Sequence, residues 1–195
     1  MNIIAGERKG AQLAAPQGMD TRPTQAKVKE SLFSIIQLYV PDARVLDLYA
    51  GSGALALEAI SRGAQSAVLC DSSREAARVI KANIEALRVQ DRARLLPMMD
   101  SQALALLGRE GARFDLVFLD PPYRLDTAAA CAQLRREGVL APGALVVIEH
   151  AAAVQPNPGT GYRMTDQRKY RDTMITFYRY EEQQDGGTVD LSGQL

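Results

Sequence analysis

The stretch RVLDLYAGSGALALEAI, residues 44–60, sets the architecture of this chain. Residues 44–48 form a mostly apolar run typical of a buried strand, whereas residues 54–62 are rich in Ala and Leu with helical spacing. Gly51 and Gly53 stand between these two segments, where the chain must turn tightly. A strand, a glycine turn and a helix in this order predict the first unit of a parallel α/β sheet.

The same alternation continues along the chain. A strand-forming or a helical pattern occupies each of the following segments: strands at residues 66–70, 94–96, 114–119 and 145–149, and helices at residues 73–87, 102–107 and 127–136. Strands that alternate with helices predict a mostly parallel, doubly wound sheet. Two further strands between residues 162 and 180 bring the expected sheet to seven strands and end it in an antiparallel hairpin.

The two ends of the chain differ from this core. Residues 1–14 are compatible with a small hairpin and residues 25–40 with a helix, so residues 1–40 are expected to form an N-terminal extension. Residues 41–180 would then form the core. From residue 181 the chain is polar and carries four acidic residues, and residues 181–195 are expected to be a disordered tail.

Composition narrows the class of protein. The 195 residues carry 23 Lys and Arg and 23 Asp and Glu, so a nucleic-acid surface would have to be a local patch. No apolar run is long enough to span a membrane, and the N-terminus lacks the pattern of a signal peptide. Cys70 and Cys131 show no metal-binding spacing and are expected to be buried thiols. These features suit a cytoplasmic protein without a metal site or a membrane segment, and we expect the protein to be a monomer.

The glycine turn predicts a nucleoside-bearing cofactor. Its glycines let the backbone approach a ligand, and the helix N-terminus behind them favours a negative group. Asp71 ends the second strand, 18 residues after Gly53, where a carboxylate can accept hydrogen bonds from ribose hydroxyls. The spacing of Gly51, Gly53 and Ala56 also fits a dinucleotide fingerprint, so an NAD(P) oxidoreductase is an alternative.

Two further acids favour S-adenosylmethionine as the cofactor. Asp47 lies four residues before Gly51, where an acid can bind the ammonium of a methionine moiety. Asp100 follows the third strand and can accept from an adenine amino group, although it can also cap the helix before Ser101. The expected cofactor-binding residues are Asp47, Ala50, Gly51, Ser52, Gly53, Asp71, Ser72, Asp100 and Ser101.

The stretch DPPY, residues 120–123, follows the fourth predicted strand and supplies the candidate chemistry. An exocyclic amine of a nucleobase is a poor nucleophile because its lone pair is delocalised into the ring. Asp120 and the Pro121 carbonyl can accept hydrogen bonds from the N–H groups of this amine, which favours a more reactive, tetrahedral nitrogen. Tyr123 offers a face on which a base stacks. A plain turn is the alternative interpretation. The expected catalytic residues are Asp120, Pro121, Pro122 and Tyr123.

Several segments resemble the RsmD family, bacterial methyltransferases of guanine N2 in small-subunit ribosomal RNA. The resemblance rests on DLYAGSGAL at residues 47–55, LEA at 57–59, SRGA at 61–64 and DPPY, which matches the family's catalytic motif. TRPT at residues 21–24 with KESLF at 29–33 resembles the family's N-terminal segment, and KYRDT at 169–173 resembles its final hairpin. The chain departs from the family pattern at Lys29, Asp71 and Arg171, where Arg, Glu and Gly are expected.

The resemblance implies a Rossmann-like, class I methyltransferase that uses S-adenosyl-L-methionine to methylate N2 of a guanine in 16S rRNA. Its partner would be 16S rRNA, within a small ribosomal subunit or an assembly intermediate. DPPY alone is shared with adenine-N6 methyltransferases of DNA or RNA, so that activity is an alternative, and a non-catalytic RNA-binding module is another. The basic residues expected to contact RNA are Arg8, Arg22, Lys27 and Lys29.

Overall fold

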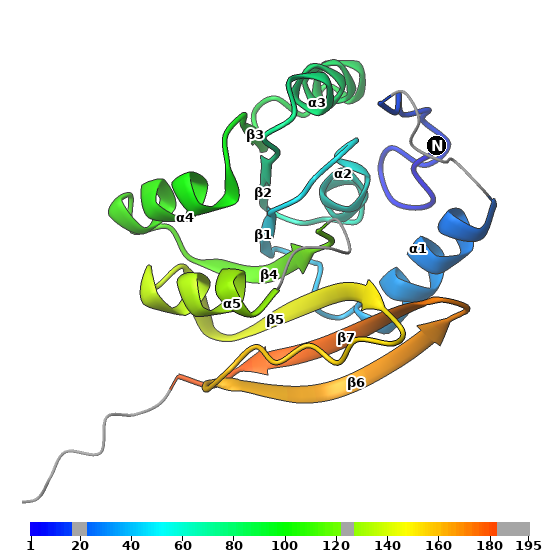
Figure 1. Ribbon diagram of the computed structural model, residues 1–195. Coiled ribbons are helices and arrows are strands. Elements are labelled where there is room, and N and C mark those ends of the chain that lie inside the picture. Colours follow the sequence, from blue (N-terminus) through cyan, green and yellow to red (C-terminus); the bar gives the residue numbers. More distant parts are fainter. Residues whose placement is uncertain (17–22, 122–126, 183–195) are drawn as a thin grey trace, which may run out of the picture.

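A single seven-stranded sheet organises the computed structural model, which describes residues 1–16, 23–121 and 127–182 (Figure 1). The strands are β1 (Arg44–Asp47), β2 (Ser66–Cys70), β3 (Ala93–Leu96), β4 (Phe114–Leu119), β5 (Leu140–Ala151), β6 (Tyr162–Tyr170) and β7 (Thr173–Tyr180). Their spatial order is β3-β2-β1-β4-β5-β7-β6; the first five are parallel, and β7 runs antiparallel to both β5 and β6. The predicted doubly wound sheet with an antiparallel C-terminal hairpin is confirmed.

Helices cover both faces of the sheet. They are α1 (Pro23–Ile35), α2 (Ala54–Ser61), α3 (Arg74–Leu87), α4 (Asp100–Arg109) and α5 (Thr127–Arg136). In Figure 1, α1, α2 and α3 lie on one side of the sheet and α4 and α5 on the other. Alternate residues of the parallel strands and of β7 therefore enter two apolar clusters, one around Phe33 and Phe118 and one around Leu104 and Leu119, whereas β6 has no buried residue. None of the helices in the described part of the chain is both long and apolar enough to cross a membrane.

Two boundaries differ from the sequence-based expectation. Helix α1 ends at Ile35 rather than near residue 40, and the chain then turns so that Ile36 and Val40 enter the core. Strand β5 starts at Leu140, five residues earlier than predicted, and its pairing with β4 shifts register between Phe114 and Leu116. The glycine and proline within this early part hid it from the alternation pattern.

The N-terminal segment forms a narrow loop that lies on α2 and α3. The expected hairpin is reduced to one antiparallel bridge between Asn2 and Gln12, flanked by a bond from the Leu13 amide to the Met1 carbonyl of 2.7 Å. Ile3 and Leu13 are buried in the core that contains Phe33. The segment is thus part of the main hydrophobic core.

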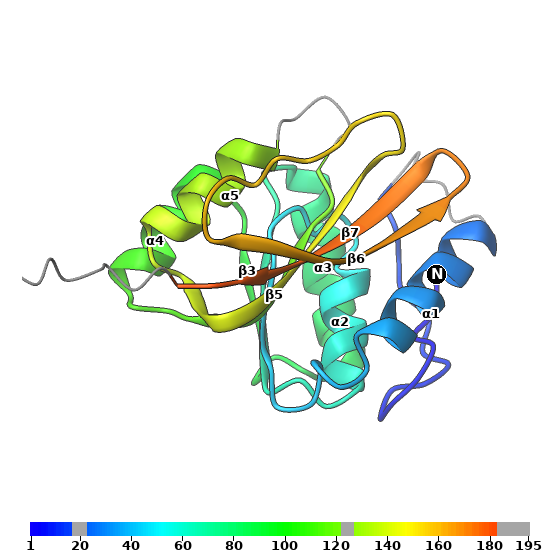
Figure 2. The same ribbon diagram turned by 90° about the horizontal axis from the view of Figure 1, so that it is seen from below.

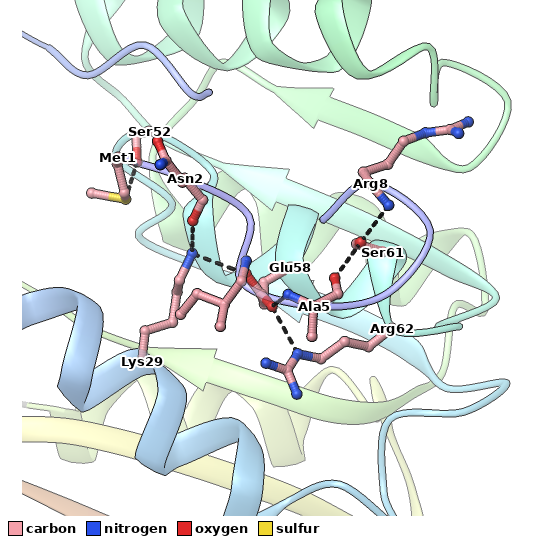
Figure 3. Close-up of polar contacts among 10 residues, drawn as sticks. Met1, Asn2, Ala5, Arg8, Lys29, Ser52, Glu58, Ser61 and Arg62 are labelled. Carbon is pink, nitrogen blue, oxygen red and sulfur yellow. Dashed lines mark hydrogen bonds and ion pairs between the residues drawn. The ribbon is translucent and has the colours of Figure 1, made fainter. Parts of the chain in front are cut away.

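Glu58, in the middle of α2, ties this segment to the core (Figure 3). Its fully buried carboxylate accepts hydrogen bonds from the amides of Ile4 at 2.8 Å and Ala5 at 3.0 Å. It also pairs with the Lys29 ammonium at 3.0 Å and with the Arg62 Nε at 2.8 Å. Burial opposes ionisation of Glu58, but the Ile4 amide, the Lys29 charge and the Arg62 hydrogen bond outweigh it, so the pKa of Glu58 is lowered.

Lys29 therefore occupies a different place from the one expected. It was predicted to contact RNA, yet the residue is only 6% exposed and its ammonium also donates to the Asn2 carbonyl at 2.8 Å. Burial lowers the pKa of this ammonium, and Glu58 offsets only part of that effect. The position of Lys29 makes it a structural ion-pair partner, which corrects its assignment to the RNA surface.

The last turn of α2 is closed by the same N-terminal segment. The Glu7 amide donates to the Ser61 carbonyl at 2.7 Å, and the Ser61 hydroxyl donates to the Ala5 carbonyl at 2.6 Å, which satisfies groups left unpaired at a helix end. A Cβ on Gly6 would stand 1.7 Å from the Ser61 carbonyl oxygen, and the φ of Gly6 is +83°. Only glycine permits this close approach.

Replacing Glu58 with Ala should lower the free energy of unfolding by about 3–5 kcal/mol, because it leaves the Lys29 ammonium buried without a counter-charge. Chemical denaturation monitored by circular dichroism measures the change. The matched control is Glu110→Ala, which removes the partner of Arg94 in an exposed ion pair and should leave stability nearly unchanged. Equal, small effects of both substitutions would contradict the role given to Glu58.

Candidate active site

Four carboxylates line the edge of the sheet where the parallel strands end. Asp71 follows β2, Asp47 ends β1, Asp120 follows β4, and Glu149 lies near the end of β5. Because side chains alternate along a strand, all four belong to the face that carries Phe118. Ligands of doubly wound sheets bind at this edge, where the strand order reverses between β1 and β4.

The glycine loop joins β1 to α2 at this edge. Gly51 and Gly53 have φ angles of 56° and 79°, and a Cβ on Gly53 would lie 2.8 Å from the Leu69 side chain. The loop begins at Ala50, which is buried, as is Ser52. The expected tight turn before the helix is thus confirmed, with the backbone held close to β2.

Asn83 on α3 supports this loop from behind. Its amide nitrogen donates to the Ser52 carbonyl at 2.9 Å and to the Ala14 carbonyl at 3.0 Å, and its side-chain oxygen accepts from the Ala14 amide at 2.8 Å. The residue is buried. Sequence reasoning missed Asn83, although a polar residue between Ile80 and Ile84 on the apolar face of a helix was the available signal.

Asp71 contacts the glycine loop directly. One carboxylate oxygen accepts from the Gly51 amide at 2.9 Å and the other from the Ser73 amide at 2.8 Å, while Ser72 is exposed beside it. Each oxygen has a further lone pair available for a ligand. Ribose binding by Asp71 stays a prediction, and its observed role is to hold the loop.

Asp100 is the first residue of α4, four residues beyond the end of β3. Its carboxylate accepts hydrogen bonds from the Tyr49 hydroxyl at 2.6 Å and from the Ser101 amide at 2.7 Å. Burial and the hydrogen bond to Asp100 raise the pKa of Tyr49. The glycine loop and the start of α4 are therefore linked through Tyr49, a residue whose part in the site the sequence did not reveal.

Asp47 is the one buried side chain, among the described residues, with a polar atom that lacks a hydrogen-bond partner. The residue is 1% exposed, and its Oδ1 is the unpartnered atom. Burial, then the neighbouring Asp120 and Asp71, raise the pKa of this carboxyl to about 7. A buried acceptor without a donor is costly unless a ligand supplies one, so Asp47 fits a cationic group such as an ammonium.

Asp120 lies one strand from Asp47. Water reaches its side chain, but surrounding protein raises the pKa of its carboxyl, and the pKa of Glu149 is raised by burial and by the charge of Asp120. Pro121 is buried, whereas Pro122 and Tyr123 lie outside the described residues. Sequence reasoning missed Glu149, although an acid at the end of the apolar run of β5 repeats the pattern of Asp47 and Asp120.

The predicted RNA-contacting residues occupy different parts of the molecule. Lys27 is exposed on α1, and Arg22 lies outside the described residues. The Arg8 guanidinium donates to the Leu87 carbonyl at the end of α3, at 2.9 Å. Since α3 follows the carboxyl end of β2, its last turn lies at the opposite edge of the sheet from Asp120, and so does Arg8.

The turn between β6 and β7 lies at the same edge as the acids, because Thr173 pairs with Ala151 at the end of β5. The Tyr170 and Ser31 hydroxyls are 2.6 Å apart, which places this turn against α1 (Figure 2). Arg171 is exposed in the turn and has a φ of 56°, a conformation that glycine adopts more readily. Arg171 therefore carries a basic side chain on a strained backbone, at the end of the sheet where the acids lie.

Comparison with known proteins defines the family. The family model described as "Conserved hypothetical protein 95" matches residues 1–179. "Putative rRNA methyltransferase YlbH" of Bacillus subtilis is 35% identical over 92% of this chain and 98% of its own length. "Ribosomal RNA small subunit methyltransferase D" of Escherichia coli strain K12 is 35% identical over 76% of this chain and 74% of its own length.

A solved structure agrees with these matches. The structure named "Putative methyltransferase yhhF from Escherichia coli" is 31% identical, covers 94% of this chain and 99% of that chain, and superimposes with a TM-score of 0.84. Sequence and fold thus lead to one family over nearly the whole chain. This protein belongs to the RsmD family, the family whose model is described as "Conserved hypothetical protein 95".

Proposed function

We propose that this protein transfers a methyl group from S-adenosylmethionine to the exocyclic N2 of a guanine in 16S rRNA of the small ribosomal subunit. The observation that carries this proposal is Asp120-Pro121 at the end of β4, one strand from the unpartnered carboxylate of Asp47. Membership of the RsmD family supports the small-subunit rRNA as substrate.

The residues of the carboxyl edge fit the cofactor. Asp47 would receive the ammonium of the methionine moiety, since its buried oxygen lacks a donor. The Gly51 and Gly53 backbone would border the same moiety, Asp71 would accept from the ribose, and Asp100 would accept from the adenine amino group with its remaining lone pairs. The bound cofactor supplies a methyl group on a sulfonium, so the protein needs no nucleophile of its own.

The protein's task is to hold the acceptor nitrogen. Asp120 and the Pro121 carbonyl accept hydrogen bonds from the two N–H groups of guanine N2. These hydrogen bonds draw the lone pair of N2 out of conjugation and toward the methyl group. The ionised Asp120 carboxylate then takes the proton that N2 loses as its fourth bond forms, and the raised pKa of Asp120 strengthens it as that acceptor. The base must be unpaired to reach this position.

The rival activity, adenine-N6 methylation, would use the same groups and is less favoured, because the two relatives described above are named for ribosomal RNA, and one of them for the small subunit. Incubation with labelled S-adenosylmethionine and small subunits from a host that lacks this methylation, followed by digestion to nucleosides, tests the choice. We expect labelled N2-methylguanine. Labelled N6-methyladenine, or no label from a protein that binds S-adenosylmethionine, would contradict the proposal.

Asp120→Ala should lower turnover by at least about 100-fold, because the amino group loses a hydrogen-bond acceptor and also the carboxylate that takes its proton. Cofactor affinity, measured by calorimetry at about pH 8, where Asp47 is ionised in both proteins, should remain near that of the unchanged protein, since Asp120 contacts the base. Asp115→Ala is the matched control: it removes a carboxylate at the other end of β4, where Asp115 pairs with Arg44. Undiminished turnover of the Asp120 variant would remove Asp120 from the chemistry.

Cofactor affinity should rise with pH between pH 5.5 and 7. Below its pKa of about 7 Asp47 is protonated and neutral, and it must ionise to bind an ammonium, so affinity falls up to about tenfold for each pH unit below that value. The α-amino group of the cofactor stays charged in this range. Calorimetric titration of the unchanged protein and of Asp47→Asn measures the effect. The same pH slope in both proteins would show that Asp47 does not bind the ammonium.

Arg171→Gly should weaken binding to small-subunit RNA and reduce the salt slope of log K by roughly 0.7–0.9, the value for one lost phosphate contact. The folded state should keep its thermal midpoint, because glycine relieves the backbone at a φ of 56°. Arg88→Gly is the control, since Arg88 is also exposed with a φ of 55° but ends α3 at the opposite edge of the sheet. Identical salt slopes for the two variants would exclude Arg171 from the RNA surface.

A further inference from the structure

Glu149 is the acid of the site to which the reaction described above gives no task. It lies on β5 next to the end of β4, where Leu119 pairs with Ile148. The following residues on the two strands are Asp120 and Glu149, and neighbouring parallel strands lie about 4.8 Å apart. Alternation places both side chains on the face of Phe118 and Val147, so the two carboxyl groups are direct neighbours.

In the described part of the chain, no hydrogen bond or ion pair joins the Glu149 carboxyl to another residue. Its neighbour on β7 is Ile175, a buried apolar residue. The adjacent His150 points to the other face, where its Nε2 lies 2.8 Å from the Thr176 hydroxyl. The charge of Asp120 is the one that acts on Glu149 and raises its pKa further than burial alone.

The neighbouring carboxylates of Asp120 and Glu149 match the Watson–Crick edge of guanine. Guanine carries two hydrogen-bond donors at adjacent positions of this edge, the N1–H and the amino group on C2. Adenine and 2-aminopurine carry a lone pair at N1, which an ionised carboxylate repels. A second acceptor beside Asp120 therefore distinguishes guanine from bases that offer an amino group without the neighbouring N1–H.

We propose that Glu149 accepts the N1–H of the target guanine while Asp120 holds N2, so that Glu149 selects guanine as the base to be methylated. This inference rests on the proposed function and adds a specificity residue to it. It also gives the two neighbouring carboxylates a reason to coexist: their mutual repulsion disfavours the charged pair in the free protein, and the two donors of guanine compensate it in the complex. Above its raised pKa of about 8 Glu149 offers only lone pairs, so a base that carries a lone pair in place of the N1–H cannot compensate this repulsion.

The test uses 2-aminopurine, which keeps the amino group on C2 but lacks the N1–H. Small subunits are reconstituted around 16S rRNA that carries either guanine or 2-aminopurine at the position found to be methylated. At about pH 8.5, where most of Glu149 is ionised, the unchanged protein should methylate the 2-aminopurine subunits with a kcat/KM roughly 10- to 100-fold lower. Glu149→Gln should close most of this gap, because its amide can rotate to donate to the N1 lone pair or to accept from N1–H.

Glu85→Gln is the matched control, an identical change at an exposed position of α3, and it should keep the original preference. Thermal midpoint and cofactor affinity of Glu149→Gln establish that the variant is folded. Equal use of the two subunits by the unchanged protein would overturn the inference. So would an equal loss on both subunits in Glu149→Gln, since Glu149 would then only support Asp120. Absence of N2-methylguanine in the unchanged protein would instead overturn the proposed function.

Discussion

The buried charge of Glu58 is the constraint on which the surroundings of the site depend. Its carboxylate receives the Ile4 and Ala5 amides, the Lys29 ammonium and the Arg62 guanidinium, so the N-terminal segment, α1 and α2 converge on one residue. Helix α2 begins at the glycine loop, and α1 contacts the tip of the β6–β7 hairpin through Ser31. Because an isolated buried carboxylate is very costly, these elements are held together or lost together.

The carboxyl edge of the sheet is built in the opposite way. Glu58 has a full set of donors, whereas Asp47 has an unpartnered oxygen and Asp120 and Glu149 face each other, so ionisation is disfavoured at all three. Such destabilised groups persist because the surrounding strands position them, and they cluster at functional sites. An ammonium beside Asp47 and the N–H donors of a base beside the other two would relieve the cost that the free protein bears.

Much of the architecture could be predicted because it depends on local patterns. Strand and helix periods, and the glycine turn at Gly51 and Gly53, are properties of neighbouring residues, and they led to the doubly wound sheet and to its functional edge. The boundaries were less accurate where tertiary packing opposed the pattern. Burial of Ile36 and Val40 ends α1 early, and the pairing of Leu140 with Phe114 extends β5 through a proline and a glycine.

The order of residues is enough to place Asp47, Asp71 and Asp120 at strand ends, since each follows an apolar run along the chain. Contacts between distant segments could not be predicted in this way. Lys29 has the sequence context of an exposed lysine but pairs with Glu58 in the interior. Asn83 forms hydrogen bonds with both Ser52 and Ala14, and Glu149 lies beside Asp120. Such long-range contacts depend on strand register and helix packing, in which many weak interactions act together. No periodic pattern among neighbouring residues encodes them.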